Sequence, residues 1–217
     1  SVDMILSDPP FNQGINYDKS FDDMKSDEVY EQELRDRIRE MSRVLKTGRV
    51  CIIFIGDRSL IHVLRAADGT DLVLAHYLKW VKDNSQSSLP VFTLFWKVEI
   101  ACLFVKGGKA NLSKYHKNVL ATDSLHYNST FAGSDEPGGG FHPCQRPYKL
   151  YERLILAFTD DGEIVLDPYL GSGTLLLAAR SCGRVGLGFE LIPKHEAFIE
   201  RRINAKITDD NLKLTDW

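Results

Sequence analysis

The sequence is poor in the features that mark membrane, secreted and metal-binding proteins. No apolar run approaches the ~20 residues that a membrane-spanning helix needs, and the first residues lack the basic segment that opens a signal peptide. Its 4 cysteines are spread along the chain without a CxxC pair, at Cys51, Cys102, Cys144 and Cys182. Such spacing is typical of reduced thiols and fits neither a disulfide framework nor a zinc site. We therefore expect a cytoplasmic protein (nuclear if its source is eukaryotic) with no metal site and no membrane partner.

Excess positive charge is also missing. The chain has 27 Lys and Arg against 30 Asp and Glu, a formal net charge of −3, and its pI is about 6.1. Proteins that coat nucleic acid are usually basic, so the overall charge argues against that class. Of its 217 residues, 43% are hydrophobic and 26% are charged, which is typical of a folded globular protein.

Apolar runs alternate with amphipathic segments along most of the chain. Strands are predicted from the runs at residues 2–6, 50–55, 72–81, 98–105, 163–166 and 185–189. Helices are predicted, from apolar positions spaced by three and four, at residues 27–46, 59–67, 146–158, 172–182 and 193–205. Strands that alternate with helices predict an α/β fold with a doubly wound, mostly parallel sheet. With no repeat and no linker, residues 1–217 are expected to form a single domain.

The segment from Asp167 to Thr174 points most clearly to a ligand. Its sequence, Asp167-Pro168-Tyr169-Leu170-Gly171-Ser172-Gly173-Thr174, follows an expected strand and opens an expected helix. An acid followed by two glycines lets the backbone approach a ligand at a helix N-terminus. Glu190 ends the next expected strand, about 20 residues on, where a dinucleotide fold holds the ribose. Leu176 replaces the last glycine of a full dinucleotide motif, so an adenosine-containing ligand other than NAD or FAD is favoured.

A second segment, Asp8-Pro9-Pro10-Phe11, follows the first expected strand. The two prolines fix the backbone, so an acid and a neighbouring carbonyl are held as two acceptors directed at one point. A planar amino group offers two hydrogens to such a pair, and the ring of Phe11 can stack on the base that carries it. The pattern therefore predicts a pocket for an amino-bearing base.

Two further segments lie between these motifs. His142-Pro143-Cys144-Gln145-Arg146-Pro147 leads into an expected helix. Upstream of it, residues 100–122 contain no acid but carry Lys106, Lys109, Lys114 and Lys117. Such a patch can bind phosphates, with an affinity that falls steeply as salt rises.

Each of these segments also has a plainer interpretation. The glycine segment is compatible with a tight turn and a helix-capping acid, and the Pro-Pro segment with a turn that ends a strand. The segment from His142 can be a loop that caps the helix, and the lysines can lie in a solvated loop.

Along the chain, Asp8–Phe11 comes first, His142–Pro147 next and Asp167–Thr174 last. In this chain order the three motifs resemble the DNA amino-methyltransferases that methylate adenine N6 or cytosine N4, and among them the permuted, beta-type group. The resemblance covers residues 2 to about 203. It implies the Rossmann-like fold of S-adenosylmethionine-dependent methyltransferases, S-adenosyl-L-methionine as cofactor, and DNA as partner. It also places a small target-recognition insert around residues 106–140, where the four lysines lie.

The resemblance assigns roles residue by residue. The catalytic pocket for the flipped base is formed by Asp8, Pro9, Pro10 and Phe11. Glu190 binds the ribose hydroxyls of the cofactor, and its remaining contacts come from Asp167, Tyr169, Gly171, Ser172, Gly173, Thr174, His142, Pro143, Gln145, Arg146 and Pro147. Tyr169 stands where the family more often has Phe, and Arg146 where it more often has Lys. Asp8 favours adenine N6, because Ser is typical of the cytosine-N4 enzymes at this position.

Several alternatives stay open at this point. The same residues suit cytosine N4 or an RNA substrate, and a non-catalytic, methyltransferase-like subunit that binds nucleic acid remains a rival. Family members usually carry a strand and a helix before the Asp-Pro-Pro strand, and we expect this chain to lack them. A homodimer or a second subunit is left open as the source of sequence specificity.

Overall fold

The computed structural model describes residues 1–15, 23–83, 98–108, 124–128 and 144–204. Its elements, in chain order, are β1 (Val2–Ser7), α1 (Asp27–Val44), β2 (Leu45–Ile55), α2 (Leu60–Ala67), β3 (Leu72–Val81), β4 (Val98–Lys106), β5 (Ser124–His126), α3 (Tyr148–Phe158), β6 (Ile164–Asp167), α4 (Thr174–Ser181), β7 (Val185–Gly188) and α5 (Glu196–Ile203). Short 3-10 turns lie at Asp57–Ser59 and Pro193–His195. None of the described helices combines the length and apolar character that a bilayer span demands.

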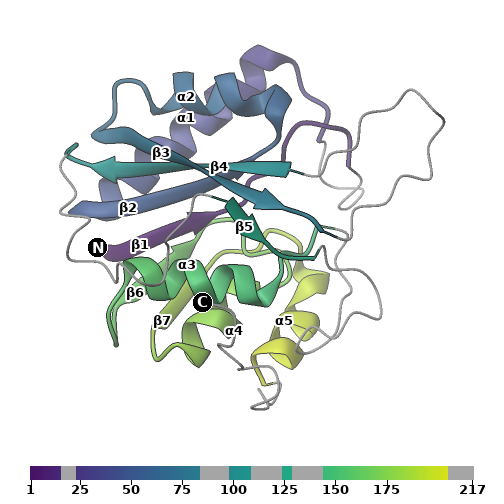
Figure 1. Ribbon diagram of the computed structural model, residues 1–217. Helices are drawn as coiled ribbons and strands as arrows, with labels where there is room; N and C mark the ends of the chain where they lie inside the picture. Colours follow the sequence, from purple (N-terminus) through teal and green to yellow (C-terminus); the bar gives the residue numbers. More distant parts are fainter. Residues whose placement is uncertain (16–22, 84–97, 109–123, 129–143, 205–217) are drawn as a thin grey trace.

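The strands form one seven-stranded sheet in the order β5-β3-β4-β2-β1-β6-β7 (Figure 1). β1 lies parallel to β2 and β6, β6 is parallel to β7, and β3 is parallel to β5. Only β4, among the described strands, runs antiparallel to its neighbours β2 and β3. The prediction of an α/β fold with a mostly parallel sheet is therefore confirmed.

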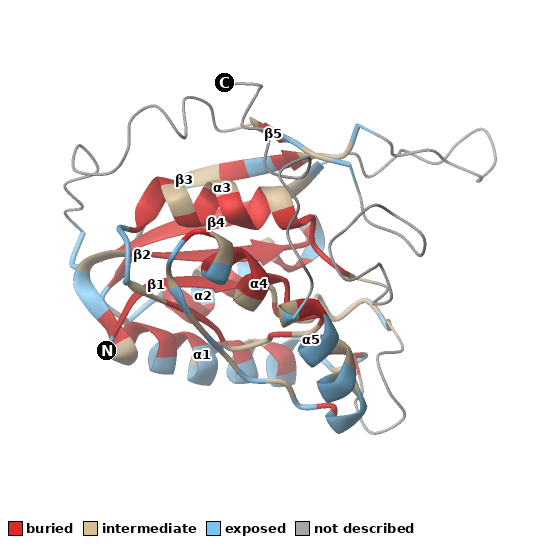
Figure 2. Ribbon diagram, turned by 90° about the horizontal axis from the view of Figure 1, so that it is seen from below, coloured by how far each residue is buried: buried red, intermediate tan, exposed pale blue. Residues whose placement is uncertain are grey.

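Helices cover the sheet on both faces, so the central strands are buried on both sides. α1 and α2 pack on one face, while α3 and α4 pack on the other (Figures 1 and 2). In β2, Ile52 and Phe54 pack with residues of α3 and α4, whereas Cys51 and Ile53 pack with residues of α1 and α2. This double burial explains why the segment reads as an unbroken apolar run rather than an alternating one.

Most element boundaries shift by one to three residues from the sequence prediction, the short strand β5 was not predicted, and the largest shift lies where α1 meets β2. α1 ends at Val44 instead of residue 46, and β2 begins at Leu45 instead of residue 50. The ammonium of Lys106 donates to the carbonyls of Ser42 and Leu45, at 2.5 and 2.8 Å, and so satisfies the backbone where α1 ends. Leu45 pairs with Val2, and the register then shifts before Val50 pairs with Met4. The predicted insert at 106–140 lies largely outside the described residues, so the domain assignment stays a prediction.

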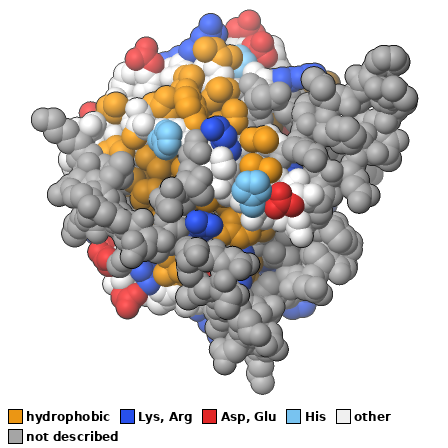
Figure 3. Space-filling model, viewed as in Figure 1, with side chains coloured by type: hydrophobic (Ala, Val, Ile, Leu, Met, Phe, Trp, Pro, Cys, Tyr) orange, Lys and Arg blue, Asp and Glu red, His pale blue; other side chains and the backbone are white. Residues whose placement is uncertain are grey.

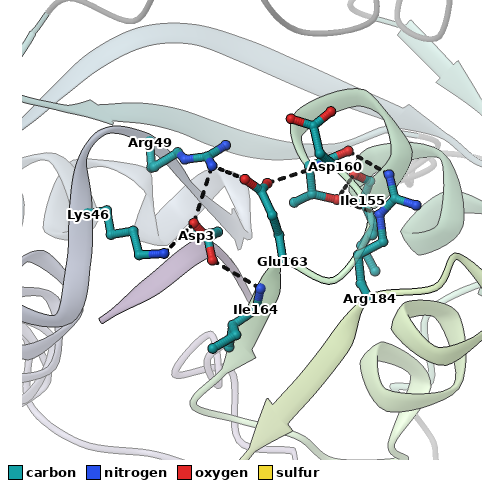
Figure 4. A network of polar contacts seen from close by, with 9 residues as sticks. Asp3, Lys46, Arg49, Ile155, Asp160, Glu163, Ile164 and Arg184 are labelled. Carbon is teal, nitrogen blue, oxygen red and sulfur yellow. Dashed lines mark hydrogen bonds and ion pairs between the residues drawn. The ribbon is translucent and has the colours of Figure 1, made fainter.

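A polar network joins three adjacent strands at the amino end of the sheet (Figure 4). Asp3 accepts from Lys46 at 2.7 Å, from Arg49 at 3.2 Å and from the backbone N–H of Ile164 at 3.1 Å. Arg49 also pairs with Glu163. Burial works against the charged form of Asp3, but Lys46, the Ile164 N–H and Arg49 outweigh it and hold its pKa below the ordinary value. The network ties β1, β2 and β6 together far from the carboxyl ends of the strands.

Candidate functional site

A cavity of about 980 Å³ opens at the carboxyl ends of β1 and β6. β1 leads to β2 on one side, while β6 leads to β7 on the other, so these neighbours form the topological switch point of the sheet. Ligands of open α/β sheets bind in the crevice at such a point. Residues of all three sequence motifs meet there. The lining includes Asp8, Pro9, Pro10, Phe11, Gln145, Arg146, Asp167, Tyr169, Gly171, Ser172, Thr174 and Glu190.

The glycine segment forms a tight cradle between β6 and α4. Gly171 and Gly173 have φ of 52° and 75°, in the left-handed region that favours glycine. A Cβ at Gly173 would lie 3.0 Å from the side chain of Ile199, so any other residue at this position would be crowded as well as strained. The carboxylate of Glu190 accepts from the backbone N–H groups of Gly171 and Ile192, both at 2.8 Å. Glu190 therefore ties the cradle to the end of β7, whereas its predicted contact with ribose hydroxyls stays a prediction.

Asp167 ends β6 at the base of this cradle. It is almost completely buried and accepts from the Tyr169 N–H at 2.9 Å. Burial raises the pKa of Asp167 to about 8, although the Tyr169 N–H opposes the shift. A cation bound beside Asp167 would favour its charged form.

Arg202, which the sequence did not single out, supports the cradle from α5. It is fully buried, and its Nη1 donates to Ser172 Oγ at 2.9 Å and to Thr174 Oγ1 at 3.0 Å. The same atom lies 3.3 Å from the Ser172 carbonyl. The only sequence signal is its place three residues after buried Ile199, on the same face of α5.

Asp8 lies beside the cradle, in contact with a residue from a distant part of the chain. Arg146 donates to both of its carboxylate oxygens, at 2.6 and 2.7 Å, and also pairs with Glu99. Glu99 pairs in turn with Lys82. Burial raises the pKa of Asp8, and the guanidinium of Arg146 opposes that rise. The side chain of Arg146 therefore contacts Asp8 in the cavity that Arg146 also lines, and its predicted contact with the cofactor stays a prediction.

The backbone of the Pro-Pro segment is held by two hydroxyl groups. Tyr30 donates to the carbonyl of Pro10 at 2.8 Å, and Ser59 donates to the carbonyl of Phe11 at 2.6 Å. Within the described part of the chain, no hydrogen bond reaches the carbonyl of Pro9. Asp8 and Pro9, which are neighbours in the chain, both line the cavity.

Few of the residues predicted to bind DNA lie in the described structure. Lys106 does, but its ammonium is bound to carbonyls at the end of α1. Lys109, Lys114 and Lys117, like His142 and Pro143, lie outside the described residues. On the face seen in Figure 3, the described basic side chains are scattered among hydrophobic ones rather than gathered in a stripe.

The residues of the cavity suit S-adenosylmethionine. The ligand carries a positive sulfonium, an ammonium and ribose hydroxyls, for which Asp167 and Glu190 supply acceptors. The glycine cradle allows close backbone approach, and Leu170, Phe189 and Ile192 give the lining an apolar part. A parallel sheet with one antiparallel strand, and this cradle at its switch point, define an S-adenosylmethionine-dependent methyltransferase.

The chain belongs to the N6/N4 DNA methylase family, whose sequence model matches residues 2–201. It is therefore a DNA amino-methyltransferase. Among curated relatives, the type II methyltransferase M.HpaI of Haemophilus parainfluenzae is 26% identical over 227 residues, which cover 95% of this chain and 69% of that protein. The type II methyltransferase M2.DpnII of Streptococcus pneumoniae is 27% identical, over 95% of this chain and 84% of its own length.

Solved structures share the fold. The M1.HpyAVI–SAM complex aligns with a TM-score of 0.71 and 22% identity, covering 94% of this chain and 89% of that chain. The PvuII DNA methyltransferase, described as cytosine-N4-specific, aligns with a TM-score of 0.75 and 20% identity, covering 98% and 83%. At these identities the likeness concerns the fold alone, and the matching family model covers N6 and N4 methylases together.

Proposed function

We propose that the protein methylates the N6 amino group of adenine in DNA and belongs to the permuted, beta-type group. The observation that carries the proposal is that Asp8 and Pro9, neighbouring residues that each carry an acceptor oxygen, line the cavity that also contains the glycine cradle. The order of the motifs supports the beta-type grouping, because Asp8–Phe11 precedes Gln145–Pro147, which precedes Asp167–Thr174. An aspartate at position 8, where cytosine-N4 enzymes typically have serine, supports adenine.

The reaction needs help from the protein because the exocyclic amino group is a poor nucleophile. Its lone pair is delocalised into the ring of the base. In our proposal Asp8 and the Pro9 carbonyl accept its two hydrogens, which favours a pyramidal nitrogen with its lone pair free. Phe11 stacks on the flipped base. The charge of Asp8 stabilises the positive charge that develops on the nitrogen as it bonds to the methyl group, and the nitrogen then releases one of its hydrogens as a proton to water.

The other side of the cavity holds the cofactor in this proposal. S-adenosylmethionine supplies, when bound, an electrophilic methyl group on a positively charged sulfur. Asp167 and the cradle from Gly171 to Thr174 bind it, and Glu190 accepts from its ribose hydroxyls. Lys109, Lys114 and Lys117 are the proposed phosphate contacts, since Lys106 is occupied at the end of α1. Recognition of a particular DNA sequence is proposed to need either a second copy of this chain or a second subunit.

Mass spectrometry of nucleosides tests the proposed function. The protein is incubated with S-adenosylmethionine and unmethylated DNA of mixed sequence, and in parallel with RNA. We expect N6-methyl-2′-deoxyadenosine from the DNA arm. N4-methyl-2′-deoxycytidine alone would move the assignment to cytosine, and methylation of RNA alone would move the substrate. No methylated nucleoside, together with no binding of S-adenosylmethionine by calorimetry, would favour a non-catalytic subunit.

A further inference from the structure

Both oxygens of Asp8 are bound before any substrate arrives. Arg146 donates from Nη2 to Oδ1 at 2.6 Å and from Nε to Oδ2 at 2.7 Å. This two-pronged geometry is the strongest form of an arginine–carboxylate pair. A carboxylate has about four acceptor positions, so each oxygen keeps the capacity to accept one further hydrogen. The contact therefore fixes the plane of the carboxylate without using up its acceptors.

Glu99 on β4 holds the guanidinium from the other side. It accepts from Nη1 of Arg146 and from the ammonium of Lys82. The side chains of Arg146, Asp8 and Glu99 are only 8%, 14% and 16% exposed. Charges that are this deeply buried each need a partner of opposite charge. The carboxylates of Asp8 and Glu99 are balanced by the cations of Arg146 and Lys82. Burial alone would raise the pKa of Glu99, but Arg146 and Lys82 bring it below the ordinary value, so Glu99 stays charged.

Aromatic rings surround the same guanidinium. Its carbon lies 5.7 Å from the ring centre of Phe11, 5.2 Å from that of Phe54 and 5.0 Å from that of Trp80. A cation attracted to the faces of several rings loses much of its freedom to turn. Trp80 is itself fixed, because its indole N–H donates to the Tyr127 carbonyl at 2.8 Å. Arg146 is thus held in one orientation by groups from β2, β3 and β4.

We propose that Arg146 is a positioning residue, which Glu99 and the aromatic rings hold so that each oxygen of Asp8 keeps a lone pair directed at the substrate amino group. The inference rests on the proposed function, because Asp8 is there the group that accepts the amino hydrogens. It gives Arg146 a role in the base pocket instead of the cofactor pocket. Lysine cannot replace it fully, because an ammonium is a point donor that does not fix the carboxylate plane.

The arrangement has a signature in the pH profile. The groups that act on the charge of Asp8 or respond to it are Arg146, Glu99, Lys82, Tyr30, Tyr151 and Asp167. Arg146 lowers the pKa of Asp8 and Glu99 raises it. Loss of the guanidinium therefore moves the acid limb of kcat to higher pH, whereas loss of the Glu99 charge moves it to lower pH.

The experiment compares the whole protein with Arg146→Met, Arg146→Lys and Glu99→Gln, and uses Arg39→Met on the exposed face of α1 as the matched control. Steady-state rates of methyl transfer to DNA give kcat and both KM values between pH 5 and 9. We expect Arg146→Met to lose about 100-fold in kcat, with KM for S-adenosylmethionine within about 3-fold. Its acid limb moves up by about one pH unit and that of Glu99→Gln moves down. Arg146→Lys falls between wild type and Arg146→Met.

An unchanged acid limb in both variants, or a wild-type kcat in Arg146→Met, would overturn the assignment. A raised KM for S-adenosylmethionine with unchanged kcat would return Arg146 to the cofactor site and also overturn it. If Arg146→Met fails to fold, Arg146→Lys and Glu99→Gln carry the same test through the pH profile. A wild-type protein that methylates no base would refute the proposed function, whereas an active wild type with unaffected variants would refute only the role of Arg146.

Discussion

The two ends of β1 each carry an aspartate bound to arginine, yet they differ in what surrounds the pair. At the amino end, Asp3 pairs with Lys46 and Arg49, and its pKa lies below the ordinary value (Figure 4). At the carboxyl end, Asp8 pairs with Arg146 at the wall of a cavity, and burial raises its pKa. Asp3, Lys46 and Arg49 do not line the cavity at the switch point, whereas Asp8 and Arg146 do. The same kind of ion pair therefore serves stability at Asp3, away from the cavity, and is available for chemistry at Asp8, which lines the cavity.

Asp8→Asn should produce the largest effect. The amide keeps the shape but presents one oxygen instead of two and no charge, so kcat for methyl transfer should fall about 1000-fold. Calorimetry should show S-adenosylmethionine binding within about 3-fold of wild type, because Asp8 lies on the base side of the cavity. A loss of cofactor binding equal to the loss of kcat would contradict the division of the cavity into two sides.

Arg202→Met should have the second largest effect. It concerns only the cavity at the carboxyl ends of the strands, where Arg202 supports the glycine cradle. Removal of the guanidinium leaves Ser172 and Thr174 without their buried donor, so the cradle loosens. We expect the affinity for S-adenosylmethionine to fall about 30-fold, which calorimetry measures. The matched control is Arg201→Met on the same helix, whose affinity should stay at the wild-type value.

Asp3→Asn should affect stability and not chemistry. The amide keeps an acceptor for the Ile164 N–H but loses the charge that Lys46 and Arg49 contact. We expect a loss of about 2 kcal/mol in the free energy of unfolding, a modest figure because Lys46 is 47% exposed. Because the pKa of Asp3 is depressed, this contribution is present at neutral pH and disappears as pH falls through that pKa. Urea titrations at pH 7 and pH 3 measure both effects; a reduced kcat in the folded protein would weaken the comparison.

The last prediction concerns Asp167→Asn and how the stability of the cofactor-free protein depends on pH. Asp167 has its pKa raised to about 8, so the folded protein binds its proton more tightly than the unfolded chain does. The Tm of the cofactor-free wild type should therefore fall as pH rises from 6 to 9, by a few degrees. The variant, which carries no charge at any pH, should show a flatter curve over that range. Equal slopes would show that another group titrates.

The sequence predicted most of the fold because the apolar runs and helical spacings are local signals. The antiparallel direction of β4 left no such signal, since a strand buried on both faces looks the same in either direction. At the early start of β2, the Leu45 carbonyl accepts from Lys106, which lies 61 residues away in the chain. Contacts across such distances are set by packing and not by local propensity.

The candidate site divides in the same way. The cradle and Glu190 could be predicted, because both depend on local sequence. The cradle needs glycines in a short turn, and Glu190 is an acid at the end of an expected strand. The partnership of Asp8 with Arg146 could not, because it joins positions 138 residues apart. Arg202 was missed since a charged residue in a charged helix segment suggests exposure, and only Ile199 marks the buried face.

The most direct test measures transfer of labelled methyl groups from S-adenosylmethionine to unmethylated DNA by Asp8→Ala and Asp3→Ala side by side. The assay is run at a temperature at which circular dichroism shows both variants folded. The account predicts a loss of about 1000-fold for Asp8→Ala and a rate near wild type for Asp3→Ala. Methyl transfer by Asp8→Ala at near the wild-type rate would contradict it.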